Sequence, residues 1–264
     1  MRRVALVTGA SSGIGEAFAE ALASRGTDLV VVARRLERLE ALRDRLTDRH
    51  GIRVHVVQAD LSRPGAVETI CTAVDRLGLQ VDILINNAGY GVSGRFIASA
   101  WPVHEAFLQV MVASVAELTH RMMPGMIERR FGRIINVASL AALLPAPAGH
   151  TLYAASKAFL VKFSEALALE GHPHNVRVTA ICPGFTMSEF HDVVGTRASV
   201  SQMPSVMWLQ ATEVAARGLD AVESGRSVVV VGRFNATLAA LARMLPQSIV
   251  SAVSRRVGRS YRKV

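Results

Sequence analysis

The chain has 264 residues, of which 50% are hydrophobic, and a formal net charge of +9. This length and hydrophobic content predict one folded domain with a large core, and they exclude a disordered chain. Two cysteines are too few for a disulfide framework, and no apolar run approaches the roughly 20 residues that a membrane-spanning helix needs.

The excess positive charge lies at the C-terminal end of the sequence. Residues 233–264 contain seven Arg or Lys and no acid, which leaves residues 1–232 with 23 basic and 21 acidic residues. A nearly neutral domain argues against nucleic acid as a partner, because nucleic-acid-binding domains carry a basic surface. Residues 1–7 run directly into the first motif and leave no room for a signal peptide, so we expect a cytoplasmic protein.

Seven short runs rich in β-branched residues predict strands. They are apolar at consecutive positions, as expected of strands that are buried on both faces. Segments of helical periodicity separate them, including residues 14–26, which end at Gly26, and residues 35–46, with leucines at positions 36, 39, 42 and 46. This alternation predicts an α/β fold: a single-domain, Rossmann-like, doubly wound parallel sheet with helices on both faces. The predicted strands lie at 4–7, 29–32, 54–57, 82–85, 133–137, 176–181 and 227–231.

The sequence TGASSGIG, residues 8–15, follows the first predicted strand and opens the first predicted helix. Gly9, Gly13 and Gly15 allow the backbone to turn tightly and to approach a pyrophosphate, whose charge the N–H groups of a helix N-terminus stabilise. The spacing is G-x-x-x-G-x-G rather than the usual G-x-G-x-x-G. The alternative interpretation is an ordinary turn between a strand and a helix.

The sequence LYAASKAF, residues 152–159, places a phenol at Tyr153 and an ammonium at Lys157. Residues four positions apart lie on the same face of a helix, so the two polar groups can converge on one point. Taken without other motifs, the pair is typical of a solvated helix surface.

Five motifs, in this order, resemble those of the classical short-chain dehydrogenase/reductase family over residues 3–232. The resemblance implies that Tyr153 exchanges a proton with a carbonyl or alcohol oxygen, that Ser139 orients this group, and that Lys157 binds the nicotinamide ribose. An ammonium about 5 Å from the phenol, at an effective dielectric constant of about 20, would lower the pKa of Tyr153 by about two units. Ser139 by itself could equally cap a loop. The motifs are TGASSGIG, NNAG at 86–89, Ser139, Tyr153-Ala-Ala-Ser-Lys157 and Pro183-Gly184.

The same resemblance implies a dinucleotide cofactor. Ala33-Arg34-Arg35 stands at the end of the second predicted strand, where family members that prefer NAD usually carry an acid. A guanidinium binds a 2′-phosphate, so we expect NADP(H), with Arg34 as the main contact and Ser11 or Ser12 assisting. Alternatively, both arginines solvate the first turn of a helix, and Pro183 and Gly184 are turn residues only. The implied cofactor contacts are Gly9, Ser11, Ser12, Gly13, Ile14, Gly15, Arg34, Asp60, Leu61, Asn87, Ala88, Gly89, Tyr153, Lys157, Pro183, Gly184 and Thr186.

Two positions depart from the family pattern. Met111 stands where the family usually has an Asn, seven residues before Leu118. A thioether accepts hydrogen bonds weakly and donates none, so we expect Met111 not to hold the helix kink and relay water attributed to that Asn. Ser139 and Tyr153 are 14 positions apart, one more than is usual in the family, which predicts a bulge within residues 145–151.

Residues 185–210 lack sustained periodicity and lie where similar proteins carry a mobile substrate lid. Their large apolar side chains favour a hydrophobic substrate, although some of them will cover the core. His150, His172 and His191 have no metal-like spacing, so no metal is predicted. The apolar side chains are those of Phe185, Met187, Phe190, Met203, Met207 and Trp208.

After Pro246 the sequence predicts an amphipathic helix with apolar and basic side chains on opposite faces. This helix could dock on its own domain or on a second subunit, lie on an anionic membrane surface, or remain in solvent, and docking or an oligomer contact is favoured. We therefore divide the chain into a catalytic domain, 1–232, and a C-terminal extension, 233–264. The two faces carry Ile249, Val250, Val253, Val257 and Tyr261, and Arg255, Arg256, Arg259, Arg262 and Lys263.

Together these features predict a homo-oligomeric NADP(H)-dependent oxidoreductase that interconverts a ketone or aldehyde and an alcohol on a hydrophobic or acyl-type substrate. One alternative is a dinucleotide-binding sensor or scaffold with weak or no catalysis, which Met111 favours. Another is a peripheral membrane protein, either an interaction module or a reductase of lipid-like ketones.

Overall fold

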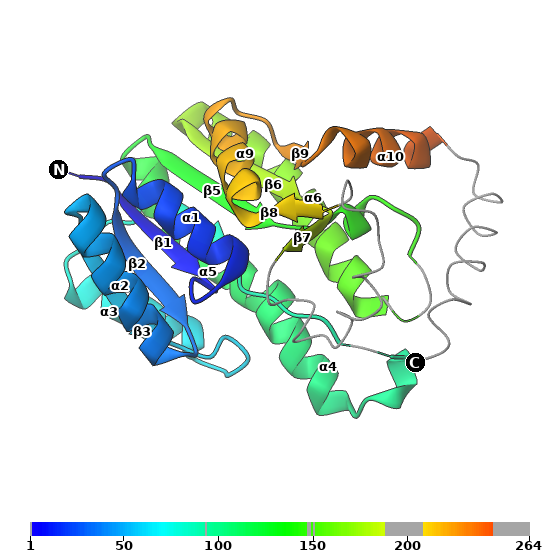
Figure 1. The fold of residues 1–264 in the computed structure, drawn as a ribbon, viewed down its shortest axis with the longest axis horizontal. Coiled ribbons are helices and arrows are strands. Elements are labelled where there is room, and N and C mark those ends of the chain that lie inside the picture. Colours follow the sequence, from blue (N-terminus) through cyan, green and yellow to red (C-terminus); the bar gives the residue numbers. More distant parts are fainter. Residues whose placement is uncertain (1, 93, 147–148, 150, 188–207, 245–264) are drawn as a thin grey trace.

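The computed structural model describes residues 2–92, 94–146, 149, 151–187 and 208–244. Within these residues a central seven-stranded sheet is covered by helices on both faces (Figure 1). The strand order is β3-β2-β1-β4-β5-β6-β9, and all neighbouring strands are parallel. The predicted Rossmann-like sheet is therefore confirmed. The strands are β1 (Val4–Thr8), β2 (Asp28–Ala33), β3 (Val54–Gln58), β4 (Ile83–Asn86), β5 (Gly132–Val137), β6 (Val176–Cys182) and β9 (Val228–Val230).

Alternate side chains of each strand enter two separate cores, which explains the continuous apolar runs. In β1, Ala5 and Val7 belong to the core on one face of the sheet, whereas Val4 and Leu6 belong to the core on the other face. A strand buried on both faces has no polar positions to alternate with. The first face is covered by α1 (Gly13–Ala23), α2 (Leu36–His50) and α9 (Ala211–Glu223), and the second by α3 (Ala66–Arg76), α4 (Trp101–Leu108), α5 (Ser114–Glu128) and α6 (Thr151–Gly171).

The predicted irregular segment 185–210 begins and ends in short strands. These strands, β7 (Phe185–Met187) and β8 (Trp208–Gln210), pair in parallel. The sequence analysis did not predict these two strands, whose Phe185 and Trp208 ring centroids lie 5.9 Å apart, and the predicted substrate lid stays a prediction. Residues 188–207 lie outside the described residues, as do positions 147, 148 and 150 of the predicted bulge and the whole of the predicted tail helix.

The last described helix is α10 (Arg233–Met244), which extends to the right of the sheet in Figure 1. Across the portions of the chain that the structure covers, no helix combines the length and the apolarity needed to cross a membrane.

Candidate active site

The three predicted catalytic side chains lie together where β5 ends. Ser139 follows β5 and caps the short helix η3 (Leu140–Ala142), with its Oγ accepting a hydrogen bond from the backbone N–H of Ala141 at 3.2 Å. Tyr153 lies in the first turn of α6 and shares a hydrogen bond with the Ser139 side chain. The carboxyl ends of parallel strands are the edge where ligands bind in sheets of this kind.

Lys157 lies one helical turn after Tyr153 and is only 6% exposed. Its Nζ lies 5.9 Å from the centroid of the Tyr153 ring and donates a hydrogen bond to the Val137 carbonyl oxygen at 2.7 Å. Burial lowers the pKa of Lys157 from 10.5 to about 8, and the nearby Cys182 thiol acts in the opposite direction. The alternative of a solvated surface pair is therefore wrong.

The pKa of Tyr153 departs from the sequence-based expectation. Burial raises the pKa of this phenol above its usual value of 10.0, and the hydrogen bond with Ser139 only partly opposes the increase. The expected lowering by Lys157 is wrong for this arrangement, because desolvation disfavours the phenolate and the Lys157 ammonium is directed at the Val137 carbonyl.

A group of four buried polar side chains, which we call the asparagine network, lies beneath these residues. Asn86 Nδ2 donates to Asn136 Oδ1 at 2.8 Å and to Thr119 Oγ1 at 3.2 Å. Asn136 Nδ2 donates in turn to Ser164 Oγ at 2.9 Å. The network joins β4, β5, α5 and α6, so it fixes α6 against β5, the strand that Ser139 follows. The sequence analysis did not predict this network. The visible signal was an Asn next to or within each of two apolar runs, Asn86 after residues 82–85 and Asn136 within residues 133–137.

The glycine turn between β1 and α1 has the compact geometry that a pyrophosphate requires. Gly9 has φ +65°, and a Cβ at Gly15 would lie 2.3 Å from the Gly9 carbonyl oxygen. Asn87 Nδ2 donates to the carbonyl oxygens of Thr8 at 3.0 Å and Gly9 at 3.2 Å, which fixes the turn against β4. The Ser12 side chain does not cap α1, so it leaves the first N–H groups of the helix available to an anion. These residues fit a dinucleotide.

The sequence model of the short chain dehydrogenase family matches residues 3–198. The chain belongs to the short-chain dehydrogenase family.

Relatives cover almost the whole of this short-chain dehydrogenase. An uncharacterized oxidoreductase of Myxococcus xanthus is 34% identical over 256 residues, which are 97% of each chain. A short-chain dehydrogenase from Sphingobium yanoikuyae, solved with NADPH, is 30% identical with a TM-score of 0.81, over 92% of this chain and 96% of that one. A 3-oxoacyl-[acyl-carrier protein] reductase from Brucella melitensis, solved with NAD, is 27% identical with a TM-score of 0.75, over 87% and 89% of the chains. The chain is thus an oxidoreductase of this family.

In this dehydrogenase, Arg35 rather than Arg34 contacts the glycine turn. Arg35 Nη2 donates hydrogen bonds to Ser11 Oγ at 3.1 Å and to Ser12 Oγ at 2.9 Å. Arg34 is exposed, and its charge acts on Asp60. The sequence analysis predicted Arg34 as the main cofactor contact, with Ser11 or Ser12 assisting, and gave Arg35 no separate role, although both arginines stand in the same dipeptide.

Asp60, another predicted cofactor contact, follows the end of β3. Partial burial raises the pKa of Asp60, but hydrogen bonds from Ser62 and the charge of Arg34 outweigh burial, so the pKa lies below 3.8. The Asp60 carboxyl accepts from the Ser62 N–H at 3.1 Å and from its hydroxyl at 2.8 Å. Leu61, the next predicted contact, is buried, and its carbonyl oxygen accepts from Ser114 Oγ at 3.0 Å.

Met111 does not remove the helix irregularity at its position. Between α4 and α5 the helix contains a π turn, η2 (Gln109–Ala113), with Met111 buried at its centre. The expectation that the kink depends on an Asn is therefore wrong, since a π turn alone bends a helix. A Cβ at Gly89 would lie 2.9 Å from Met111 Sδ, so the thioether packs directly on the NNAG motif.

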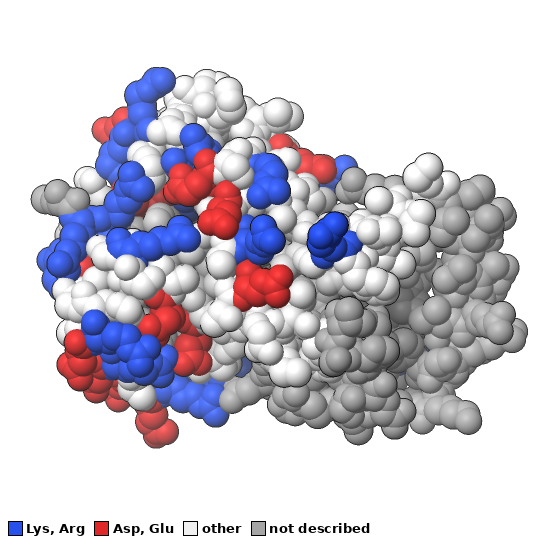
Figure 2. Space-filling model, turned by 45° about the horizontal axis from the view of Figure 1, so that its top comes forward, with Lys and Arg blue, Asp and Glu red and all other residues white. Residues whose placement is uncertain are grey.

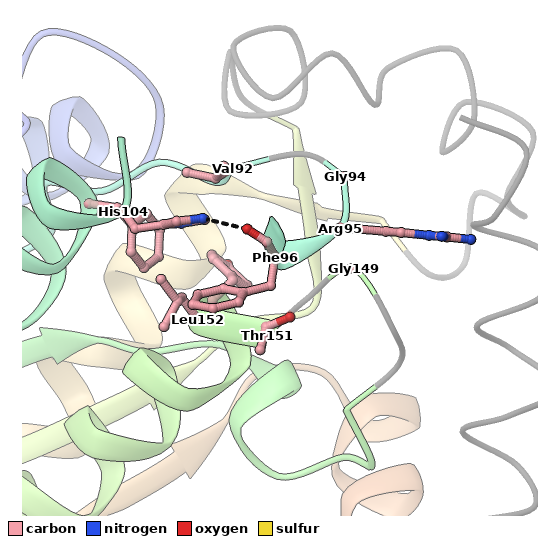
Figure 3. A pocket seen from close by; sticks show the side chains of 10 residues that line it. Val92, Gly94, Arg95, Phe96, His104, Gly149, Thr151 and Leu152 are labelled. Carbon is pink, nitrogen blue, oxygen red and sulfur yellow. Dashed lines mark hydrogen bonds between the residues drawn. The ribbon is translucent and has the colours of Figure 1, made fainter. Parts of the chain in front are cut away.

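A small pocket of about 20 Å³ opens beside Tyr153 (Figure 3). His104 closes one side: its Nε2 lies 2.7 Å from the Phe96 carbonyl oxygen, and the two rings stack at 4.7 Å. This bond fixes the loop before α4 onto α4. The pocket is lined by Val92, Gly94, Arg95, Phe96, His104, Phe107, Gly149, Thr151, Leu152 and Tyr153.

The Pro183-Gly184 turn has a partner that sequence reasoning missed. A Cβ at Gly184 would lie 2.6 Å from Asn235 Nδ2, so the buried Asn235 of α10 packs directly on the turn. Thr186 is also buried, and its Oγ1 donates to the Gly184 carbonyl oxygen at 3.1 Å. His172 lies in the short helix η4 (His172–His174), and the described residues contain no group of side chains suited to a metal ion.

Proposed function

We propose that this short-chain dehydrogenase is an NADP(H)-dependent oxidoreductase that interconverts a ketone or aldehyde and an alcohol. The observation that carries the proposal is the group formed by Ser139, Tyr153 and Lys157 at the carboxyl edge of the sheet, next to the glycine turn. The substrate and the cofactor would meet at this edge.

The residues at the end of β2 favour NADP(H) over NAD(H). Arg34 and Arg35, the two residues that directly follow β2, provide two guanidinium groups at the position where an acid would repel a 2′-phosphate. The Sphingobium yanoikuyae relative binds NADPH, which supports the proposal, whereas the Brucella melitensis relative was solved with NAD. The uncapped N-terminus of α1 would hold the pyrophosphate, and Lys157 the nicotinamide ribose.

When bound, NADPH would supply the hydride in reduction. Ser139 donates a hydrogen bond to the carbonyl oxygen and holds it beside Tyr153. Because its pKa is raised, the Tyr153 phenol keeps its proton at neutral pH and can give it to the oxygen as the alcohol forms. The phenolate left behind is stabilised by its hydrogen bond with Ser139.

The pocket beside Tyr153 favours a substrate with an apolar body. Val92, Phe96, Phe107 and Leu152 line it, while Arg95 is the charged residue of its rim. At about 20 Å³ the pocket itself has room only for a water-sized group, so the support for an apolar substrate comes from the character of its walls and not from its volume.

The test measures NADPH oxidation at the nicotinamide absorbance band across a panel of ketones of increasing apolar size. We expect Tyr153→Phe to abolish turnover and to leave NADPH binding, followed by fluorescence, unchanged. Ser139→Ala is the matched variant, since it removes the orienting hydroxyl but keeps the proton donor, and we expect it to retain a small residual rate. Undiminished turnover by Tyr153→Phe would refute the proposal.

Met111 supports a second candidate, a dinucleotide-binding protein with weak catalysis. A thioether cannot order a proton-relay water as an amide can. If this candidate is correct, Met111→Asn raises a very low ketone-reducing rate. A wild-type rate of ordinary size, with no gain from Met111→Asn, discards it.

A further inference from the structure

A second cavity lies at the edge of the central sheet opposite the candidate active site. Arg3 directly precedes β1, Thr27 directly precedes β2 and Arg133 is the second residue of β5, so the cavity they line lies at the amino ends of these strands. Its volume is about 300 Å³, compared with about 20 Å³ for the pocket beside Tyr153. That volume is at the lower limit for ligand pockets, and its described lining includes no predicted cofactor or catalytic residue. We call it the amino-edge cavity.

The lining of the amino-edge cavity combines buried apolar side chains with charged ones. Arg3, Arg25 and Glu223 are exposed, whereas the guanidinium group of Arg133 is buried. Among the described lining residues, three guanidinium groups therefore accompany one carboxylate, which leaves two positive charges in excess. The buried apolar side chains are those of Leu22, Ile83, Leu219 and Val222.

The surface around the amino ends of the strands is rich in basic side chains. In Figure 1 the chain begins at the left, where β1 starts, and Figure 2 shows Lys and Arg side chains gathered on the left of the molecule, with acidic side chains among them. A positive potential at the mouth of a cavity raises the local concentration of small anions. The two excess charges of the lining would act in this way.

Arg133 has one nitrogen without a partner, although its side chain is only 6% exposed. Its Nε donates to Glu223 Oε2 at 3.0 Å, and its Nη1 donates to the carbonyl oxygens of Gly132 at 2.8 Å and Asn175 at 3.0 Å. Within the part of the chain that the structure describes, Nη2 donates to no protein atom. A buried donor without an acceptor lowers stability, so an acceptor bound in the cavity would be stabilising.

Phe131 holds two of the guanidinium groups close together. Cζ of Arg3 lies 3.9 Å and Cζ of Arg133 lies 4.3 Å from the centroid of the Phe131 ring. Burial lowers the pKa of Arg133, and the hydrogen bond with Glu223 opposes this effect. The charges of Arg177 and Arg3 add to the lowering. An anion that binds near these groups would relieve their mutual repulsion.

A structural role for the arginines at helix ends does not explain Arg3 and Arg25. Helices α1 and α9 end at this edge, and arginines often bind the free carbonyl groups of helix C-termini. Arg177 has that role, since its Nη1 donates to the Glu223 carbonyl oxygen. Neither Arg3 nor Arg25 donates a side-chain hydrogen bond to any described residue, and the exposed ion pair of Arg25 with Asp220 is 3.8 Å long. Such a pair contributes little, so both arginines are available to a ligand.

We propose that the amino-edge cavity binds a small organic anion, whose carboxylate or phosphate group contacts Arg3, Arg25 and Arg133. Its apolar body lies against the buried leucine, isoleucine and valine side chains of the lining. A planar guanidinium can donate two parallel hydrogen bonds to either anionic group, and a hydrocarbon body excludes water from the apolar side chains. The proposal goes beyond the proposed reaction and does not depend on it: an inactive protein would still bind the anion.

The test is isothermal titration calorimetry of the full chain with hexanoate and with hexyl phosphate, which carry the two kinds of anionic group. We expect at least one of them to bind at a single site, and hexanol, which has no charge, to bind at least about tenfold more weakly. Acetate and inorganic phosphate, which lack the apolar body, should also bind at least about tenfold more weakly than the corresponding six-carbon anion. Saturation with NADPH should leave the affinity unchanged, because the glycine turn lies at the other edge of the sheet.

A pair of variants locates the site. The double variant Arg3→Gln/Arg25→Gln should weaken binding at least about tenfold, because it removes two charged donors. Arg217→Gln is the matched control, since Arg217 is an exposed arginine of α9 outside the lining, and it should change the affinity less than about twofold. Circular dichroism reports that each variant is folded.

Four results would each overturn the proposal. They are no binding of either six-carbon anion by the wild-type protein, displacement of the anion by NADPH, equal affinities for anions with and without the apolar body, and an unchanged affinity in the Arg3→Gln/Arg25→Gln variant.

Discussion

Removal of the Asn136 side chain tests whether the asparagine network holds the catalytic helix in place. Asn136→Ala breaks the hydrogen bonds with Asn86 at 2.8 Å and with Ser164 at 2.9 Å. Two buried hydrogen bonds contribute about 1 kcal/mol each, and the space left by the amide adds about 0.5 kcal/mol. Asn86 keeps its bond to Thr119, and Ser164 keeps its bond to the Leu160 carbonyl oxygen, so both remain partly satisfied. We expect a loss of about 2–3 kcal/mol in the free energy of unfolding.

Urea denaturation followed by circular dichroism measures this loss, and ketone reduction measures its effect on α6. Ser164→Ala leaves Asn136 Nδ2 without its acceptor and should cost about 1–2 kcal/mol. The double variant should cost about 1 kcal/mol less than the sum, because both single variants break the same bond. We expect kcat to fall while the Kd for NADPH stays constant. A loss below about 1 kcal/mol for Asn136→Ala, or strict additivity, would refute the reasoning.

Three more predictions concern the same site. The folded-state pKa of Lys157 is lowered from 10.5 to about 8, so this group makes the unfolding free energy rise with pH from about 8 to about 10, and Lys157→Met should remove that rise in urea denaturation series. Gly15→Ala should weaken NADPH binding at least about tenfold in fluorescence titrations, because its Cβ meets backbone 2.3 Å away, whereas Gly26→Ala, with no atom near its Cβ, should lower stability only. Arg34→Ala and Arg35→Ala should each weaken NADPH binding about tenfold without affecting NADH, and equal effects on both cofactors would contradict the assignment of a 2′-phosphate site.

The strands were predictable because burial on both faces leaves an unambiguous signal. All seven apolar runs became strands to within one residue at either end. The three-residue strands β7 and β8 were not predictable, since their pairing depends on Phe185 and Trp208 meeting across a long segment. A strand of three residues is too short for its own sequence to indicate that it will pair with a distant strand.

The candidate site was likewise predictable only where a local sequence motif marks it. The motifs gave the identity of Ser139, Tyr153 and Lys157 and their common location, because each motif ends a strand or opens a helix. They did not give the direction of the pKa shift of Tyr153, which depends on how completely the folded chain excludes water from the phenol. Nor could spacing reveal that Arg35 binds Ser11 and Ser12, which lie more than 20 positions away in sequence.

The contact between Asn235 and Gly184 makes α10, near the C-terminal end of the sequence, part of the surroundings of the candidate active site. The Asn235 amide that packs on this turn lies beyond residues 3–198, which the family model matches. A tilt or a slide of α10 would displace the Pro183-Gly184 turn, on which Asn235 packs. A partner that binds the outer face of α10 can therefore change the turnover rate without contacting the substrate or the cofactor.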